Sequence, residues 1–207
     1  MNLKYSYWYF KQALSPKVCD DMIKYGKSFQ DGLAKIGGHE GDTAKINIKN
    51  LKKKRNSNIV WLNDPWIYNQ IHPYVHMANK NAGWNFDWDY SESCQFTKYN
   101  KKQFYGWHRD SWEIPYHEPN NPRRHNKIRK LSVTISLSGP EDYKGGNLEF
   151  NLNKGDLSQK FNKLICKEIR PRGSIVVFPS FTLHRVQPVT KGTRYSLVVW
   201  NLGYPFR

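Results

Sequence analysis

The chain has 207 residues, a length typical of a single domain with a sizeable core. Its 33 Lys and Arg residues against 17 Asp and Glu residues give a formal net charge of +16, and aromatic residues make up 15% of the sequence. The aromatic content excludes a disordered polycation, and the charge predicts a basic surface that attracts an acidic protein, a ribosome or nucleic acid, or that serves solubility alone.

Three cysteines, Cys19, Cys94 and Cys166, are far apart in the sequence and lie in apolar segments. Their odd number and their spacing favour free thiols in a reducing compartment over a disulfide framework. The first residues contain no apolar run long enough for a signal peptide, and no stretch reaches the length of a membrane span. We therefore expect a cytoplasmic protein without a membrane partner.

The first 29 residues predict one strand and one helix. Alternating aromatic residues within 1–14 predict the strand, and Ser15 followed by Pro16 predicts the start of the helix, with an N-cap and a proline at the first helical position. Apolar residues then recur at helical spacing, so this helix should cover one face of a sheet: Val18, Met22, Ile23 and Phe29.

Residues 30–57 are rich in glycine and polar residues and end in a basic run, which predicts a solvated loop or hairpin, with a substrate contact as the less favoured alternative. Asn58–Leu62 then has the composition of a short strand. Asp64 and Pro65 predict a second helix, which Pro73 should kink or shorten, because proline removes one backbone donor and clashes with the preceding turn.

After residue 90 the pattern changes to strands and turns. On one strand, Gln95, Thr97 and Tyr99 share a polar face suited to line a pocket. The clearest strand is Leu131–Ser138, where apolar residues alternate with serine and threonine, so that one face should be core and the other should line a cavity. Further strands and a tight turn are predicted downstream: Asn147–Leu152, Leu164–Arg170 and Pro171–Gly173.

These elements predict a fold that is mainly β with N-terminal helices (α+β). Strands and turns with almost no helix over residues 91–207 are typical of a double-stranded β-helix, or jelly-roll, core. The whole chain, 1–207, is therefore interpreted as one domain, in which a helical and loop part over residues 1–90 precedes this core.

A His-x-Asp pair, His108 and Asp110, follows the strand that contains Tyr99. In an extended backbone residues two apart project to the same side, so this imidazole and this carboxylate can hold one metal ion. We propose His184 as a third ligand, because two histidines and one carboxylate from distant strands make the facial triad of non-haem Fe(II) oxygenases. Arg194 begins a further alternating strand, and its guanidinium would suit the far carboxylate of 2-oxoglutarate.

Four other histidines are weaker metal candidates. His72 and His76 lie four apart on the second predicted helix, but no third ligand lies near them and Pro73 separates them, so we expect packing or surface roles. His117 and His125 lie in the long segment between Asp110 and Leu131, which contains several prolines and no periodicity, and we interpret them as loop residues.

The combination of Tyr99, His108-x-Asp110, "LSVTISLSGPEDYKGGNLEF" and "FPSFTLHRVQPVTKGTRYSLVVW" resembles the 2-oxoglutarate and Fe(II)-dependent oxygenases of the prolyl 4-hydroxylase group, and within it the PKHD-type hydroxylases of bacteria and phages. The resemblance covers roughly Asn58 to Trp200. It implies that the iron ligands are His108, Asp110 and His184, that Arg194 anchors 2-oxoglutarate, and that Tyr99 donates a hydrogen bond to this cosubstrate.

The resemblance also implies the reaction. An enzyme of this kind uses Fe(II), 2-oxoglutarate and O2, with ascorbate as reductant, to hydroxylate a substrate C–H bond while 2-oxoglutarate is decarboxylated to succinate and CO2. A prolyl residue in a peptide or protein is the favoured substrate. An oxygenase acting on a small molecule, on another side chain or on nucleic acid is the first alternative, and a non-catalytic jelly-roll binding module is the second.

Substrate contacts are expected beside the ligands and in the following loop. In the family, the loop at this place folds over the peptide substrate, which suggests Trp112, Tyr116, Arg123 and Arg124 as contacts. Tyr105 and Trp107 flank the metal ligands and could equally wall the pocket or pack against the core. The oligomeric state does not follow from the sequence.

Overall fold

The computed structural model describes residues 3–29, 32–33, 53–152 and 162–206. The middle of the segment 30–57, for which we expected a loop or hairpin, lies outside these ranges. Its described ends, Gly32–Leu33 (β2) and Arg55–Asn56 (β3), are short strands. None of the described helices is long and apolar enough to cross a membrane.

The two helices predicted for the N-terminal part are present. Helix α1 spans Pro16–Lys27, and the Ser15 side chain caps it by accepting a hydrogen bond from the Val18 amide at 3.3 Å. Helix α3 spans Pro65–Asn81 and continues through Pro73, so of the two expected effects of this proline the shortening was wrong, and the kink stays a prediction. Burial of one apolar face against the sheet outweighs the one lost backbone hydrogen bond: Ile67, Ile71, Val75 and Ala78 are all buried.

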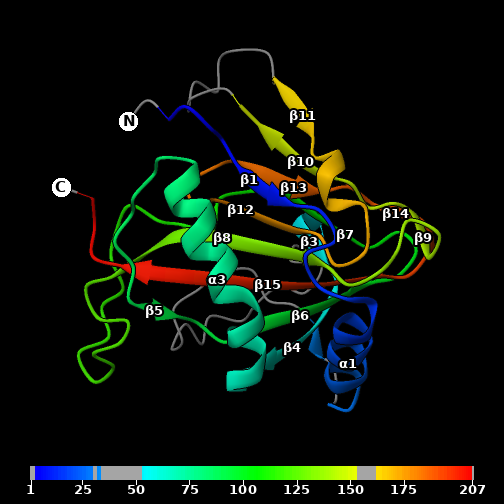
Figure 1. Cartoon of the computed structure of the whole chain (residues 1–207), viewed down its shortest axis with the longest axis horizontal. Coiled ribbons are helices and arrows are strands. Elements are labelled where there is room, and N and C mark those ends of the chain that lie inside the picture. Colours follow the sequence, from blue (N-terminus) through cyan, green and yellow to red (C-terminus); the bar gives the residue numbers. More distant parts are fainter. Residues whose placement is uncertain (1–2, 30–31, 34–52, 153–161, 207) are drawn as a thin grey trace.

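An eight-stranded antiparallel sheet forms the larger layer. Its order is β1-β12-β8-β15-β6-β4-β2, and β5 pairs with β15 beside this path. In that order the strands are β1 (Trp8–Phe10), β12 (Ile175–Pro179), β8 (Ile128–Ser136), β15 (Arg194–Gly203), β6 (Cys94–Tyr99), β4 (Asn58–Leu62) and β2, with β5 at Tyr90–Ser91. The helix α3 crosses the face of this sheet (Figure 1).

A five-stranded sheet forms the second layer, in the order β11-β10-β13-β7-β3. The strands not yet given are β11 (Lys163–Ile165), β10 (Leu148–Asn151), β13 (His184–Val186) and β7 (Phe104–His108), and a separate pair joins β14 (Val189–Gly192) to β9 (Tyr143–Gly145). From β6 onward the chain passes back and forth between the two large sheets, as in a double-stranded β-helix. The predicted fold class is confirmed.

The alternation predicted for the strand after the long loop is present in β8. Leu131, Val133 and Ile135 are fully buried in the core cluster that includes α3. The intervening Ser132 and Ser136 side chains are buried on the opposite face, which the second sheet covers. The larger sheet therefore has an apolar outer face under the helices and a polar inner face, and this polar face is available for a functional site.

One predicted strand was wrong. In place of a strand over Leu164–Arg170, the strand β11 ends at Ile165 and a 3-10 helix, η1, follows at Lys167–Ile169. Side chains three residues apart lie on the same side of a 3-10 turn, so Cys166 and Ile169 can both join the hydrophobic cluster that contains Phe150, which an extended backbone would not allow. All three cysteines are buried free thiols.

Gly173, in the predicted turn before β12, has φ +76° and lies against the backbone of Leu14. A Cβ atom there would meet both left-handed strain and a collision with the Leu14 carbonyl oxygen, so we expect Gly173→Ala to lower the free energy of unfolding by about 3 kcal/mol. Gly83→Ala is the matched control, since Gly83 has φ +68° but nothing within 4 Å of its Cβ position, and should cost only about 1 kcal/mol. Urea denaturation measures both; equal losses would contradict the close contact at Gly173.

Candidate metal centre

Three side chains meet where β7 and β13 pair. His108 ends β7 and His184 begins β13, and the two residues are direct partners in the antiparallel register. The Nε2 atoms of His108 and His184 lie 3.5 and 3.6 Å from the two carboxylate oxygens of Asp110, which follows β7 by two residues. One ligand atom from each of the three residues lies within 4.8 Å of the others. The structure thus brings together the three metal ligands proposed from the sequence.

Backbone carbonyls orient the two imidazoles. His108 Nδ1 lies 2.8 Å from the Gly106 carbonyl oxygen, and His184 Nδ1 lies 2.9 Å from that of Thr182. A carbonyl only accepts hydrogen bonds, so each Nδ1 carries the proton and each Nε2 keeps a lone pair directed toward Asp110. This is the tautomer that a metal-binding histidine requires.

Two serines hold the Asp110 carboxylate. Ser132 on β8 donates a 2.8 Å hydrogen bond to Asp110 Oδ2, and its own hydroxyl oxygen lies 2.8 Å from Ser180 Oγ. Because Ser132 has one proton, Ser180 is the donor in the second bond. The Ser180 carbonyl also accepts from the backbone amides of Asp110 and Ser111. The larger sheet therefore fixes a carboxylate that belongs to the smaller one.

Charges around the site favour its metal-binding protonation states. Burial raises the pKa of the Asp110 carboxyl, but His184, His108 and Arg129 outweigh burial and hold this pKa well below its ordinary value. Burial and then His108 lower the pKa of His184 to about 4, although Asp110 opposes them. At neutral pH the carboxylate is ionised and the His184 imidazole is neutral, as metal ligation demands.

Arg194, at the start of β15, is 1% exposed and lies opposite Tyr99 of β6 in the register. Its Nη1 donates to Ser196 Oγ at 3.2 Å, and its guanidinium carbon lies 5.3 Å from the centre of the Tyr99 ring. Among the described residues no group accepts a hydrogen bond from its buried Nε atom, and no carboxylate pairs with it. A buried guanidinium in this state fits an anionic ligand such as a carboxylate.

The donor set fits a divalent transition metal. Two neutral imidazole nitrogens and one carboxylate on one side leave the remaining coordination positions to ligands from outside the chain. Together with the buried Arg194 guanidinium on the inner face of the neighbouring sheet, these residues fit a metal-chelating dicarboxylate.

The expected flanking residues separate into two groups. The Tyr105 ring stacks on the His108 imidazole, with 3.5 Å between ring centroids, and therefore belongs to the site. Trp107 precedes His108 in an extended strand, so it lies on the other face, where the Arg185 guanidinium is 4.8 Å from its ring centroid. The structure does not bring Trp107 to the ligands.

The loop after Asp110 presents one exposed aromatic side chain and one buried one. Trp112 is 45% exposed, whereas Tyr116 is buried against the Arg124 guanidinium, 4.3 Å from its ring centroid. Arg123 is exposed. Of the loop residues expected to touch a substrate, Trp112 and Arg123 are thus accessible, and Arg124 is engaged with Glu92 and Glu118.

A partly buried ion pair that the sequence did not reveal fixes this loop. Arg129 donates through Nε to Glu92 Oε2 at 2.9 Å and through Nη1 to the Asp110 carbonyl at 3.4 Å. Its guanidinium also covers the Trp200 ring, at 3.9 Å from the centroid. No sequence motif surrounds Glu92 or Arg129. The two residues come together because β5, which precedes Glu92, and β8, which contains Arg129, both pair with β15.

The four weaker histidine candidates, His72, His76, His117 and His125, pack against other rings. The His72 and His76 rings lie 5.4 and 4.7 Å from that of Trp88, and His72 Nε2 is 3.0 Å from Ser91 Oγ. His125 Nδ1 accepts from the Glu118 amide at 3.2 Å. None of them joins a metal-binding group within the described ranges.

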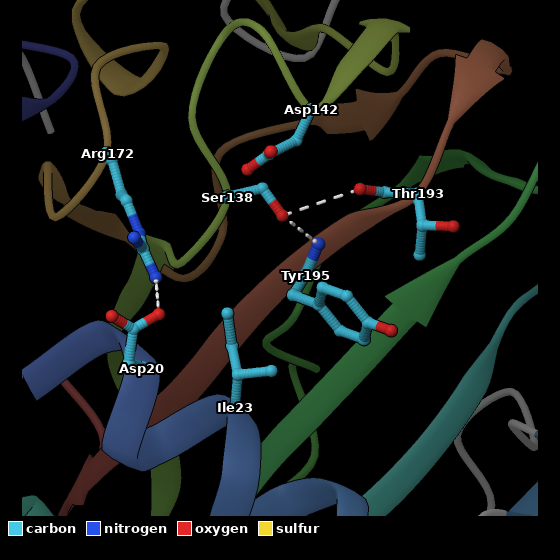
Figure 2. A pocket seen from close by; sticks show the side chains of 7 residues that line it. All are labelled: Asp20, Ile23, Ser138, Asp142, Arg172, Thr193 and Tyr195. Carbon is cyan, nitrogen blue, oxygen red and sulfur yellow. Dashed lines mark hydrogen bonds and ion pairs between the residues drawn. The ribbon is translucent and has the colours of Figure 1, made fainter. Parts of the chain in front are cut away.

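A cavity of about 360 Å³ lies away from the ligand cluster, between α1 and the start of β15 (Figure 2). Tyr195 lines it from the face of β15 opposite to Arg194. Its charged groups are already engaged: Arg172 pairs with Asp20 at 2.5 Å, and Asp142 accepts from the Gly139 amide at 2.7 Å. This cavity is therefore not the candidate site.

Comparison with known proteins identifies related chains. The sequence profile described as the 2OG-Fe(II) oxygenase superfamily matches residues 94–201, about half of the chain. A PKHD-type hydroxylase of Synechococcus sp. (strain JA-2-3B'a(2-13)) is 41% identical over 78 residues, which are 37% of this chain and 31% of the relative. The match thus spans about a third of that relative's length.

Solved structures share the fold over nearly the whole chain. The viral collagen prolyl hydroxylase of Paramecium bursaria Chlorella virus-1, in its 2OG complex, superposes with a TM-score of 0.63 at 19% identity, covering 97% of each chain. A Trichoplax adhaerens prolyl hydroxylase, solved with a hypoxia-inducible factor peptide fragment, gives 0.62 at 14% identity, covering 96% of this chain and 84% of the other.

The serine that holds Asp110 provides a test of the metal centre. We expect Ser132→Ala to weaken Co(II) binding by about 10- to 100-fold, because Asp110 loses the hydrogen bond that orients it. Ser136→Ala is the control, since Ser136 is equally buried on β8 but donates to the Ser138 carbonyl. Calorimetry of Co(II) binding measures both variants; equal affinities in the two would show that Ser132 does not position a ligand.

Proposed function

Because the chain belongs to the 2OG-Fe(II) oxygenase superfamily, we propose that it is an Fe(II)- and 2-oxoglutarate-dependent dioxygenase that hydroxylates a substrate C–H bond. Fe(II), bound with 2-oxoglutarate and O2, would supply the oxidising chemistry, with succinate and CO2 as the products of the cosubstrate. His108, Asp110 and His184 would hold the metal. The protein contributes ligand geometry, cosubstrate orientation and exclusion of water.

The observation that carries this proposal is the pairing of the ligand cluster with Arg194. A binding module needs neither a metal-ligand triad nor a buried guanidinium with an unused donor, whereas a 2-oxoglutarate oxygenase needs both. Arg194 would receive the far carboxylate, and the burial of Arg194 strengthens this charge-assisted contact. Tyr99, beside Arg194 on the neighbouring strand, would donate a hydrogen bond to the same carboxylate.

We further propose a prolyl residue in a peptide or protein as the substrate. Aromatic side chains near the loop support this, since proline-rich chains dock on aromatic surfaces. Trp61 is 53% exposed and its ring lies 6.0 Å from that of Trp200, and Trp112 is 45% exposed above Arg129. The names of the relatives, PKHD-type hydroxylase and prolyl hydroxylase, point the same way.

Three finer features stay part of the proposal. Ascorbate would serve as the reductant, and the cytoplasm would be the site of action. The formal net charge of +16 would draw an anionic partner such as an acidic protein, a ribosome or nucleic acid, which bears on the further inference below.

Turnover without a prime substrate tests the proposed site. Purified protein with Fe(II), ascorbate and 2-oxoglutarate should form succinate slowly, and His108→Ala should abolish this. Arg194→Gln should raise the KM for 2-oxoglutarate by about 10- to 100-fold, because it removes a charge-assisted hydrogen bond. Arg109→Gln, which removes an exposed charge beside the ligands, should leave the KM unchanged. The proposal fails if succinate formation is absent from wild type and 2-oxoglutarate does not bind.

Trp112 gives a separate test of the substrate surface. In an assay with proline-containing peptides, Trp112→Ala should raise the KM for a stimulating peptide about tenfold, while the uncoupled rate stays the same, because the exposed ring would touch only the peptide. Trp66→Ala is the control, as Trp66 is also exposed but lies on α3. If both variants behave like wild type, Trp112 does not contact the substrate.

A further inference from the structure

A second buried arginine lies beside the ligand cluster. Arg55 belongs to β3, the edge strand of the smaller sheet, and is the register partner of Tyr105 on β7. It is 3% exposed, and its guanidinium carbon lies 4.3 Å from the centre of the Tyr105 ring. That ring stacks on His108, so the cation of Arg55 is one aromatic ring away from a metal ligand.

Arg55 repeats the local arrangement of Arg194. Each arginine bonds the serine two residues further along its own chain: Arg55 Nε donates to Ser57 Oγ at 3.0 Å, and Arg194 Nη1 donates to Ser196 Oγ. Each lies against a tyrosine of a neighbouring strand. These tyrosines, Tyr105 and Tyr99, pack in one hydrophobic cluster. The two sheets thus each direct one buried arginine to the same region.

Like Arg194, Arg55 carries a buried donor that no described group uses. Its Nη2 atom has no hydrogen-bond partner in the described part of the chain, and no carboxylate there forms an ion pair with it. Arg129 shows the usual solution for a buried guanidinium, which is a direct pair with Glu92. A buried cation without a counter-charge is costly, and a binding site that receives an anion removes this cost.

The proposed function accounts for only one of the two arginines. 2-Oxoglutarate has two carboxylates; one would bind at the metal held by the ligand cluster, and Arg194 would take the other. Asp110 accepts a hydrogen bond from Ser132 and faces both histidines, and it forms no ion pair with Arg55. Neither the cosubstrate nor a carboxylate of the described residues therefore supplies an anion to Arg55.

We propose that Arg55 binds a carboxylate of the hydroxylated substrate and so selects an acidic substrate; this inference rests on the proposed oxygenase function. The planar fork of an arginine matches a carboxylate, and its position one ring from His108 places that carboxylate close to the reacting carbon. Two sources share this chemistry: an acidic side chain next to the modified residue of a peptide, or the terminal carboxylate of a small substrate.

Probes that differ only in charge test the proposal. A proline-containing peptide with Asp beside the proline is compared with its Asn counterpart, and N-acetylproline with N-acetylprolinamide. Binding is measured by calorimetry and by the rise in Tm, with Co(II) and 2-oxoglutarate present and again with Co(II) alone. In wild type we expect at least one acid to bind ten or more times as tightly as its amide. The pair that shows the preference identifies the source of the carboxylate.

Variants assign the preference to Arg55. Arg55→Gln should reduce the ratio of acid to amide affinity to about one, and Arg55→Lys should restore part of it. Arg109→Gln, which removes a charge next to His108 without a buried contact, should keep the full ratio. The Tm of ligand-free Arg55→Gln should equal or exceed that of wild type, because the substitution removes an unpaired buried cation.

Several outcomes would overturn the proposal. The first is equal binding of acids and amides by wild type. The second is a preference for acids that persists in Arg55→Gln together with a lower Tm, which would show that Arg55 has a structural role. A loss of 2-oxoglutarate affinity in Arg55→Gln as large as that in Arg194→Gln would instead make Arg55 a cosubstrate residue. Failure of the proposed oxygenase function gives a different result from failure of this inference. In that case wild type neither forms succinate nor binds 2-oxoglutarate, whatever the ratio of acid to amide affinity.

Discussion

The antiparallel register of β7 and β13 is the constraint on which the site depends. It sets His108 directly opposite His184, and the chain then turns so that the Asp110 carboxylate lies between the two Nε2 atoms. A shift of this register by one residue would place one imidazole on the outer face of the sheet, so that the three side chains would no longer meet. Pairing of two short strands, rather than any single side chain, therefore creates the metal-binding geometry.

The larger sheet fixes the position of Asp110 and adds a buried arginine to the site. Its polar inner face provides Ser132 for Asp110 and Arg194 for a carboxylate, while its apolar outer face packs under the helices. Arg129 ties the Asp110 carbonyl to Glu92 and so connects the ligands to the loop that carries Trp112. The two sheets thus supply complementary parts of one site: the smaller sheet brings the candidate ligands, and the larger sheet brings the serine that fixes Asp110 and a buried cation.

Sequence patterns predicted what depends on local periodicity. The alternation in β8, the N-cap and proline that begin α1, and the strand Asn58–Leu62 were correct, because their causes lie within a few residues. The facial triad could be proposed because the His-x-Asp spacing is local and only one distant ligand had to be added. Its geometry is now described, whereas the roles assigned to these residues in catalysis stay predictions.

Features that arise from long-range packing could not be predicted. Pro73 does not end α3 because buried apolar contacts hold the helix on the sheet, and the chain after β11 turns into a 3-10 helix because two side chains must reach one cluster. Two contacts join residues far apart in the sequence: the Arg129–Glu92 pair spans 37 positions, and the stacking of Arg55 on Tyr105 spans 50. Both depend on strand pairings that neither sequence segment alone predicts. No local signal marked these side chains as part of a site.

The most direct test of the account is whether 2-oxoglutarate binding requires the metal. Calorimetric titration of the wild-type protein without oxygen, once with Co(II) and once with a chelator, measures the dissociation constant in both states. If the ligand cluster and Arg194 share one dicarboxylate, binding should be one to one and at least about tenfold tighter with the metal, a difference of about 1.4 kcal/mol. Equal affinity in the two states would contradict a common site.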